Sequence, residues 1–395
     1  MSLLLIQAAN YILPLIILPY LMRILGIEKF GVVMFAQSFA VFFNIIVDFG
    51  FTISATREIS IVRDDKKERS KIFISVFIIK LLLIFVSFLL LFIIINLFSR
   101  FSEYSIIYYL SFGVVIGQAL FPVWFFQGIE KMKYVTFVNV AAKIIFTALV
   151  FLLITKEEDF IYVPLFNSLG YIMAGAIGLF ISFKHITFLI PKQQEIASIF
   201  KESFSLFVSN FSSSLVSSCN TFILGVFTND TLAGVFSSFE KLILAVKNVF
   251  LPIYQALFPW VAKQGFETKK AVLKKTAPIV LCIGVLISFF IWIFGTEALN
   301  IIYDNEEVTS YNLLFKFLGL IAIFSSISML LLVMYFPAIK QYNLRMKIFI
   351  IAGIINVSLS CILVYYYNIY GITISVVFTE FILLLLSLYY YKKTT

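Results

Sequence analysis

Five lysines lie inside stretches of the chain that are otherwise apolar and long enough to cross a bilayer. They are Lys80, Lys143, Lys241, Lys247 and Lys316. An ammonium group at mid-depth in a membrane costs at least about 2.5 kcal/mol, so each lysine requires a water-filled cavity, an anionic partner or a substrate. Placed by depth at about 1.5 Å per residue, the five form a series from one side of the bilayer to the other. A path for an anion would require such a series.

Structural explanations compete with this interpretation and stay open at the level of sequence. Lys80 and Lys316 lie close enough to the ends of their stretches for the ammonium groups to snorkel to a surface. The other three lie deeper, and each faces a cavity or forms an ion pair that holds helices together. The candidate partners for such pairs are Asp48, Glu240 and Glu380.

Two acidic residues are candidates for coupling transport to a cation. Asp48 has Asn44 one helical turn before it, a pair that suits a cation, a proton or a structural hydrogen bond. Glu240 and Lys247 are seven residues apart and point within about 20° of each other, whereas Lys241 is turned by about 100°. That separation is too long for a direct bond between Glu240 and Lys247, so water or a partner helix must serve both.

The composition assigns the chain to integral membrane proteins. Hydrophobic residues make up 62% of the sequence and charged residues 13%, far from the roughly 45–50% and 25% of a soluble domain. With about 20 apolar residues needed per crossing, we predict twelve transmembrane helices. They are 2–22, 31–54, 72–98, 105–128, 134–154, 161–183, 203–227, 231–260, 277–298, 310–335, 348–367 and 371–391. These segments are apolar on every side, so helices and not barrel strands are expected.

The distribution of basic residues predicts the orientation. The loop after the second span is rich in lysine and arginine, and alternate loops after it follow the same pattern. The intervening loops carry acidic residues such as Glu157, Asp159 and Asp304. Both termini are therefore expected in the cytoplasm. The net charge of +9 follows mainly from this topology and does not indicate nucleic-acid binding.

A short internal match suggests that the chain consists of two halves. GIEKFGVVMFAQSF at 26–39 resembles TNDTLAGVFSSFEKL at 228–242, and both begin a helix after a tight hairpin. Two parallel repeats of this kind are common in transporters. We therefore expect a six-helix lobe at 1–183, a cytoplasmic linker at 184–202 and a second six-helix lobe at 203–395.

Prolines within the spans are candidate hinges, because proline removes a backbone donor and permits a kink. Pro14 and Pro252 are the best placed of these. Other reactive residues suggest no chemistry. His185 lies in a loop without an obvious partner, and the cysteines lack metal-ligand spacing and are expected to act as small packing residues. We expect no enzyme motif, no metal site and no cofactor.

Four blocks of sequence carry a resemblance to a known family. They are NYILPLIILPYLMRILGIEKFG (10–31), VDFGFTISATREIS (47–60), PVWFFQGIEKMKYVTFVNVAAK (122–143) and FEKLILAVKNVFLPIYQALFPWVAK (239–263). The chain resembles the O-antigen type polysaccharide flippases of the multidrug/oligosaccharidyl-lipid/polysaccharide exporter group. The likeness extends to the number and order of the predicted spans.

The resemblance implies a function in lipopolysaccharide and surface polysaccharide biosynthesis. The chain would move an oligosaccharide repeat unit, carried on polyprenyl diphosphate, across the bacterial inner membrane by alternating access. The lysines would hold the diphosphate, and Asp48 or Glu240 would couple a cation. Aromatic residues such as Trp124 would stack on sugars or mark the membrane interface. Candidate partners are membrane lipids, a polysaccharide polymerase and a chain-length regulator.

Two other functions remain compatible with the sequence. A drug or cation antiporter of the same group would rely on intramembrane carboxylates, which are fewer here than the lysines. A non-transporting scaffold for glycan assembly enzymes would leave the intramembrane charges dispensable.

Overall fold

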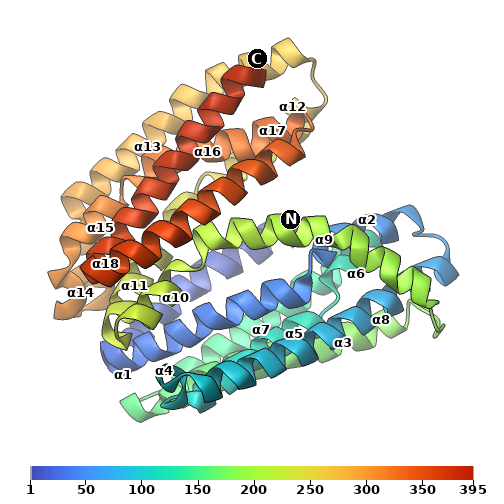
Figure 1. Cartoon of the computed structure of the whole chain (residues 1–395), viewed down its shortest axis with the longest axis horizontal. Helices are drawn as coiled ribbons and strands as arrows, with labels where there is room; N and C mark the ends of the chain where they lie inside the picture. The colour runs from blue at the N-terminus through green and yellow to red at the C-terminus, as the bar shows by residue number, and fades with distance from the viewer. Residues whose placement is uncertain (1, 395) are drawn as a thin grey trace. The chain divides into compact units, whose positions relative to one another are not determined.

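The computed structural model describes the backbone of residues 2–394, and the side chains of 13–394 other than 217, 255, 256 and 259. This part of the chain is all helical and divides into two compact units, Met1–Phe211 and Ser212–Thr395. Figure 1 shows the helices of the Met1–Phe211 unit in blue to green and those of the Ser212–Thr395 unit in yellow to red. The predicted boundaries at 183 and 203 stay predictions.

The Met1–Phe211 unit contains nine α-helices and a short 3₁₀ helix, η1 (Glu157–Ile161). The α-helices are α1 (Ser2–Asp48), α2 (Phe51–Ile61), α3 (Lys66–Leu97), α4 (Ser99–Ser102), α5 (Ser105–Leu120), α6 (Val123–Gly128), α7 (Met132–Leu153), α8 (Tyr162–Phe183) and α9 (Gln193–Ser217). The last of these, α9, continues into the second unit.

The Ser212–Thr395 unit follows with shorter and more interrupted helices. They are α10 (Asn220–Phe227), α11 (Asp230–Asn248), α12 (Leu251–Ala262), α13 (Phe266–Tyr303), α14 (Glu306–Ser310), α15 (Asn312–Leu318), α16 (Ile321–Met329), a π-helical turn η2 (Leu330–Tyr335), α17 (Phe336–Ala338) and α18 (Tyr342–Thr394). Tyr254 of α12 and Tyr335 of η2 are fully buried in the core of this unit.

Eight helices in the described part of the chain are long and apolar enough to cross a membrane. They are Leu13–Ile61, Lys66–Leu97, Ser105–Gly128, Met132–Leu153, Glu157–Phe183, Phe266–Tyr303, Asn312–Ala338 and Tyr342–Thr394. The chain is therefore a multi-pass helical membrane protein. The expected count of twelve and the cytoplasmic location of both termini stay predictions.

Two helices, α1 with 47 residues and α18 with 53, are much longer than one crossing requires, and each contains a backbone break. The break in α1 falls at Gly26, where φ is 69°, a left-handed conformation that glycine adopts without steric cost. In α18 it falls at Asn368, where φ is 50°; asparagine tolerates this region better than most residues. Each long helix thus consists of two helical segments.

The predicted spans 203–227 and 231–260 do not appear among the eight. The first forms parts of α9 and α10, and the second forms α11 and α12, which are separated at Val249 and Phe250. Within 231–260, Glu240, Lys241 and Lys247 make α11 too polar to qualify by composition. The polar residues that suggest function thus account for α11, whereas α12, with 12 residues, is too short to cross a membrane alone.

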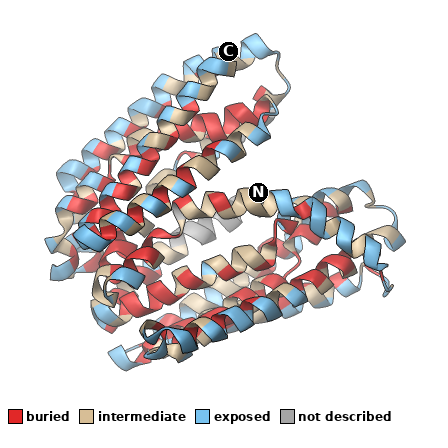
Figure 2. Ribbon diagram, in the orientation of Figure 1, coloured by how far each residue is buried: buried red, intermediate tan, exposed pale blue. Residues whose placement is uncertain are grey.

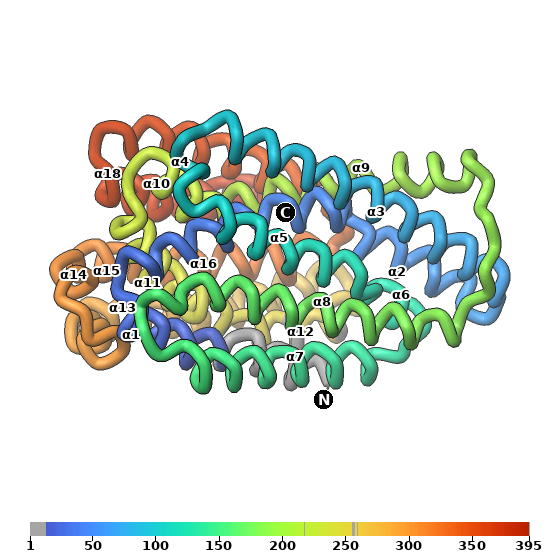
Figure 3. Tube along the Cα trace, turned by 90° about the horizontal axis from the view of Figure 1, so that it is seen from below, coloured from blue at the N-terminus to red at the C-terminus, as the bar shows by residue number. Residues whose placement is uncertain are grey.

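Helices α5 and α8 run side by side (Figure 3), and small residues allow their backbones to approach closely. A Cβ atom at Gly117 would lie 2.3 Å from the backbone carbonyl carbon of Tyr171, and one at Gly175 would lie 2.5 Å from the carbonyl oxygen of Gly117. The hydroxyl of Ser168 also donates a hydrogen bond to the carbonyl of Leu110. Close backbone approach through small residues is the usual way in which membrane helices associate.

We expect Gly117→Ala to destabilise this helix pair, because the added methyl group meets backbone that no rotamer change can move. Overpacking of this kind costs about 1–3 kcal/mol. Gly170→Ala in α8 is the matched control, since its Cβ would come no closer than 3.5 Å to a neighbouring atom. Thermal unfolding of the two purified variants measures the difference, and equal melting temperatures would contradict the packing argument.

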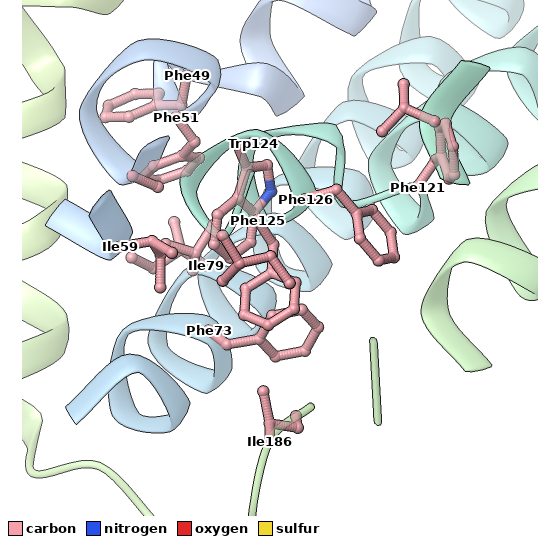
Figure 4. Packing of buried hydrophobic residues seen from close by; sticks show 14 of the residues in the cluster. Phe49, Phe51, Ile59, Phe73, Ile79, Phe121, Trp124, Phe125, Phe126 and Ile186 are labelled. Atoms are coloured by element: carbon pink, nitrogen blue, oxygen red, sulfur yellow. The ribbon is translucent and has the colours of Figure 1, made fainter. Parts of the chain in front are cut away.

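Aromatic side chains from α2, α3 and α6 form a hydrophobic core cluster in the Met1–Phe211 unit. Figure 4 shows this cluster. Trp124 is 2% exposed, and its ring centroid lies 5.5 Å from that of Phe73. Phe125 and Phe126, beside it in the sequence, are fully buried. The expectation that Trp124 stacks on a sugar is therefore wrong for this conformation, because the neighbouring rings enclose its side chain; its place at the membrane interface stays a prediction.

Burial follows the faces by which helices pack within each unit, as Figure 2 shows. The outer faces of α3 and α13 instead expose large apolar side chains, among them Leu82 and Phe85 on α3 and Phe289 and Phe290 on α13. A soluble protein would rarely expose such continuous apolar surface. Contact with lipid hydrocarbon accounts for it.

Candidate functional site

Lys80 and Asp48 form an ion pair between α3 and the end of α1. The distance from Lys80 Nζ to Asp48 Oδ1 is 3.7 Å, and the Lys80 side chain is only 5% exposed. Thr52 Oγ1 donates a hydrogen bond of 2.6 Å to the same carboxylate oxygen. Phe49 and Gly50 have positive φ angles and separate α1 from α2, which places Asp48 and Thr52 on either side of the break.

This arrangement changes the interpretation of both residues. Snorkelling does not account for Lys80, because its ammonium group is buried beside a carboxylate and does not reach a surface. Asp48 already has one lysine as a counter-ion, so it is a less favourable ligand for a second cation than the sequence suggests.

Glu240 of α11 lies against the first residues of α10. Thr221 Oγ1 donates a hydrogen bond of 2.7 Å to Glu240 Oε2, and Asn220 Nδ2 donates one of 3.3 Å to Oε1. The amide oxygen of Asn220 is buried and has no hydrogen-bond partner among the described residues. A carboxylate, a hydroxyl and a free amide oxygen therefore lie together, and these are ligand types that hard cations and protons use.

Lys247, two turns further along α11, forms an ion pair with Glu380 of α18. The side chain of Glu380 is 6% exposed and that of Lys247 is 21% exposed. Glu240 and Lys247 are too far apart along α11 for a direct bond, so water or a partner helix was expected to bind both. In the structure, two different helices serve them: α10 binds Glu240 and α18 binds Lys247.

A buried polar network lies next to this pair and joins α10 to both segments of α18. Asn356 Nδ2 donates a hydrogen bond of 3.2 Å to Thr379 Oγ1, the neighbour of Glu380. The Sγ atom of Cys219 lies 3.3 Å from Asn356 Oδ1. Cys219 is thus a member of a polar network and more than a small packing residue.

The remaining lysines are half-buried. Lys241 follows Glu240 in α11, and neither Lys241 nor Lys316 has an ion-pair partner among the described residues. Lys143 lies in α7. Lys80 and Lys143 therefore belong to the first unit, and Lys241, Lys247 and Lys316 to the second.

The two candidate hinge prolines occupy different positions in their helices. Pro252 lies in the first turn of α12, directly after the interruption between α11 and α12, where a proline is easily accommodated. Pro14 lies within α1, whose backbone break is at Gly26. A hinge role for either residue stays a prediction.

His185 lies in the loop between α8 and α9, near basic residues. Its carbonyl accepts hydrogen bonds from Arg69, and its Nε2 atom lies 3.5 Å from Lys131 Nζ. Burial, followed by the charges of Lys131 and Arg69, lowers the pKa of His185. Among the described residues, no group of three or more histidine, cysteine or acidic side chains could hold a metal ion.

Several residues of these clusters escaped the sequence analysis. They are Thr52, Asn220, Thr221, Asn356 and Thr379. Each is a polar residue within or beside an apolar segment. The lysines were selected because they lie inside apolar segments, and the same criterion applied to amides would have selected Asn220 and Asn356.

Comparisons with known proteins extend over the whole chain. Residues 1–264 match the sequence profile of a family described as "Polysaccharide biosynthesis protein". A Shigella dysenteriae protein named "Putative O-antigen transporter" is 31% identical over 389 residues, which cover 97% of each chain. An Escherichia coli K12 protein of the same name is 28% identical over 64% of this chain and 62% of its own length.

Solved structures resemble the fold at low sequence identity. An inward-facing multidrug transporter of the MATE family superposes with a TM-score of 0.68, at 14% identity and covering 100% of this chain and 98% of its own. The lipid II flippase MurJ in an inward closed conformation gives 0.69, at 17% identity and covering 98% and 87%. These likenesses establish a MATE-like fold over the full length.

Proposed function

The chain belongs to the polysaccharide biosynthesis protein family, and we propose on that basis that it is a flippase for lipid-linked O-antigen repeat units. The observation that carries this proposal is the 31% identity to an O-antigen transporter over 97% of the chain. The substrate would be an oligosaccharide on polyprenyl diphosphate, moved across the bacterial inner membrane by alternating access of two lobes. The membrane transporter class that the sequence analysis expected is confirmed at the level of the family.

The lysines supply the chemistry that the cargo requires. A diphosphate must leave water to cross the membrane, and charge-assisted hydrogen bonds from ammonium groups replace part of its hydration. Lys241 suits this role best, because it lies deeper in its apolar stretch than Lys316 and, although its charge acts on the adjacent Glu240, it forms no ion pair with a described carboxylate. Lys143 and Lys316 are further candidates along the path, whereas Lys80 and Lys247 hold carboxylates in this conformation.

Glu240 is the residue that we assign to cation coupling. Its carboxylate accepts hydrogen bonds from the neutral side chains of Asn220 and Thr221. The charges of Lys241 and Lys247 also act on it, but it forms no ion pair with a described residue, whereas Asp48 has Lys80 at 3.7 Å. The interruption before Pro252 lies in the same pair of helices, so a change at Glu240 has a nearby point at which the helix direction can change.

The alternatives have weaker support. The structural neighbours include multidrug transporters, but at 14% identity they establish the fold alone. If the protein were a scaffold, the buried ion pairs would serve only to hold helices together. A polysaccharide polymerase and a chain-length regulator are proposed partners through their shared substrate.

Deletion of the gene tests the proposed function. Lipid-linked repeat units should accumulate on the cytoplasmic face of the inner membrane, and wild-type protein should reverse this. Lys241→Ala should fail to restore export at wild-type protein levels, whereas Lys241→Arg should restore part of it. Normal export in the deletion strain would contradict the transport function, and full activity of Lys241→Ala would contradict the role of this lysine.

A further inference from the structure

A polar cavity lies within the Met1–Phe211 unit, where α1, α5 and α8 meet. Its volume is about 130 Å³, well above the roughly 10–15 Å³ that a cavity needs to hold one water molecule. The polar side chains in its wall are Gln37, Asn44, Ser111, Gln118, Asn167 and Tyr171. Figures 1 and 3 show that the three helices run alongside one another.

The chemistry of this wall is unusual for a membrane protein interior. Four of the side chains are primary amides and two are hydroxyls, and none of the lining residues is charged. The other members of the lining are small and apolar. Ligand sites are usually mostly apolar with a few polar groups that fix the orientation of the ligand. Amides and hydroxyls set among apolar residues give this wall the same character, so it suits an uncharged ligand that has both polar groups and apolar faces.

One group in the wall lacks an internal partner. Ser111 is 2% exposed, and its hydroxyl forms no hydrogen bond with any described residue. Leaving a buried hydroxyl without a partner costs about 1–3 kcal/mol, although the close packing of α5 on α8 at Gly117 holds it in place. The Ser111 oxygen has almost no exposed surface in this conformation, so it is an unsatisfied hydrogen-bonding group beside the cavity and not a direct contact for a ligand.

The absence of charge in this lining argues against an anionic ligand, because a diphosphate would need cationic donors. The amide oxygens alone make a weaker cation site than one with carboxylates, which supply most protein ligands for hard cations and are not among the lining residues. Amides both donate and accept hydrogen bonds, as sugar hydroxyls and N-acetyl groups do. A neutral saccharide therefore matches this wall in its hydrogen-bonding capacity and in its lack of charge.

We propose that this cavity binds a neutral sugar residue of the transported oligosaccharide. The inference rests on the proposed function and assigns the two parts of the substrate to different groups. The lysines bind the diphosphate, and the amides of α1, α5 and α8 bind the glycan. A site that hydrogen-bonds substrate hydroxyls discriminates strongly against ligands that lack them. The cavity is thus where the first unit would recognise the sugar.

Binding to the purified full-length protein in detergent tests this inference. The two probes are the lipid-linked repeat unit, extracted from the producing bacterium after deletion of this gene, and the same polyprenyl diphosphate without sugar. Wild-type protein should bind the repeat unit more tightly than the bare carrier. Gln118→Met and Asn167→Leu should each reduce that advantage by about 2- to 12-fold, the range for one neutral hydrogen bond, and leave the affinity for the bare carrier unchanged.

Asn139→Leu is the matched control, because Asn139 lies on α7, outside the lining, and donates its hydrogen bond to the carbonyl of Val135. It should leave the sugar-dependent advantage unchanged. An unchanged advantage in Gln118→Met and Asn167→Leu, an equal loss for both probes, or the absence of any advantage in wild type would overturn the inference while preserving the transport function. Failure of wild type to bind either probe would overturn the proposed function as well.

Discussion

Replacing Lys247 with alanine is expected to destabilise the protein by about 3–5 kcal/mol, the usual effect of removing one partner of a buried ion pair. The change leaves the carboxylate of Glu380, 6% exposed, without its cation next to the network of Asn356 and Thr379. A large drop in melting temperature and a smaller yield of folded protein from membranes should follow. An unchanged melting temperature would mean that the pair contributes nothing to the folded state.

The double variant Lys247→Met, Glu380→Gln separates folding from transport. Removing both charges while keeping the volume is often close to neutral for stability, so this variant should regain most of the melting temperature. Its transport should stay at least about tenfold below wild type if the ammonium also meets the diphosphate, because a hydrogen bond to a charged group contributes about 1.5–3 kcal/mol. Wild-type transport in the double variant would assign Lys247 to structure alone.

Much of the architecture could be predicted from the sequence because hydrophobicity determines it. The predicted spans 72–98 and 277–298 are strongly apolar, and the structure contains them within the long helices Lys66–Leu97 and Phe266–Tyr303. Prediction was weaker where polar residues interrupt an apolar run. Around α11 and α12, one expected span is instead two helices separated at Val249 and Phe250, and the hydropathy of the whole segment does not reveal this division.

The site shows the same limit more sharply. A lone lysine in an apolar segment is visible in the sequence, but its partner depends on which helices are neighbours. Asp48 and Lys80 are 32 residues apart, and Lys247 and Glu380 are separated by 133 residues. Counting residues along each predicted span gives the depth of a side chain in the membrane. It does not show which helices are in contact. The polar cavity of α1, α5 and α8 escaped prediction for this reason, since its lining comes from three separate segments.

Replacing Glu240 with glutamine is expected to abolish the dependence of transport on a cation gradient while the protein remains folded. Glutamine keeps the size of the side chain and an oxygen that accepts the hydrogen bond from Thr221, but it cannot carry the negative charge that binds a cation or titrates with a proton. Coupling between two sites typically amounts to about 1–3 kcal/mol, or about 5- to 150-fold. The rate of gradient-driven transport should therefore decrease by a factor within this range.

Proteoliposomes with an imposed sodium or proton gradient measure this effect as the rate at which lipid-linked repeat units cross the bilayer. Glu297→Gln makes the same change on α13 at an exposed position and should keep the gradient dependence of wild type. Without a gradient, Glu240→Gln and wild type should equilibrate the substrate at similar rates, because the lysines that meet the diphosphate are intact. If Glu240→Gln still responds to one of the gradients as wild type does, the coupling carboxylate lies elsewhere, and Asp48 with its counter-ion Lys80 becomes the next residue pair to test.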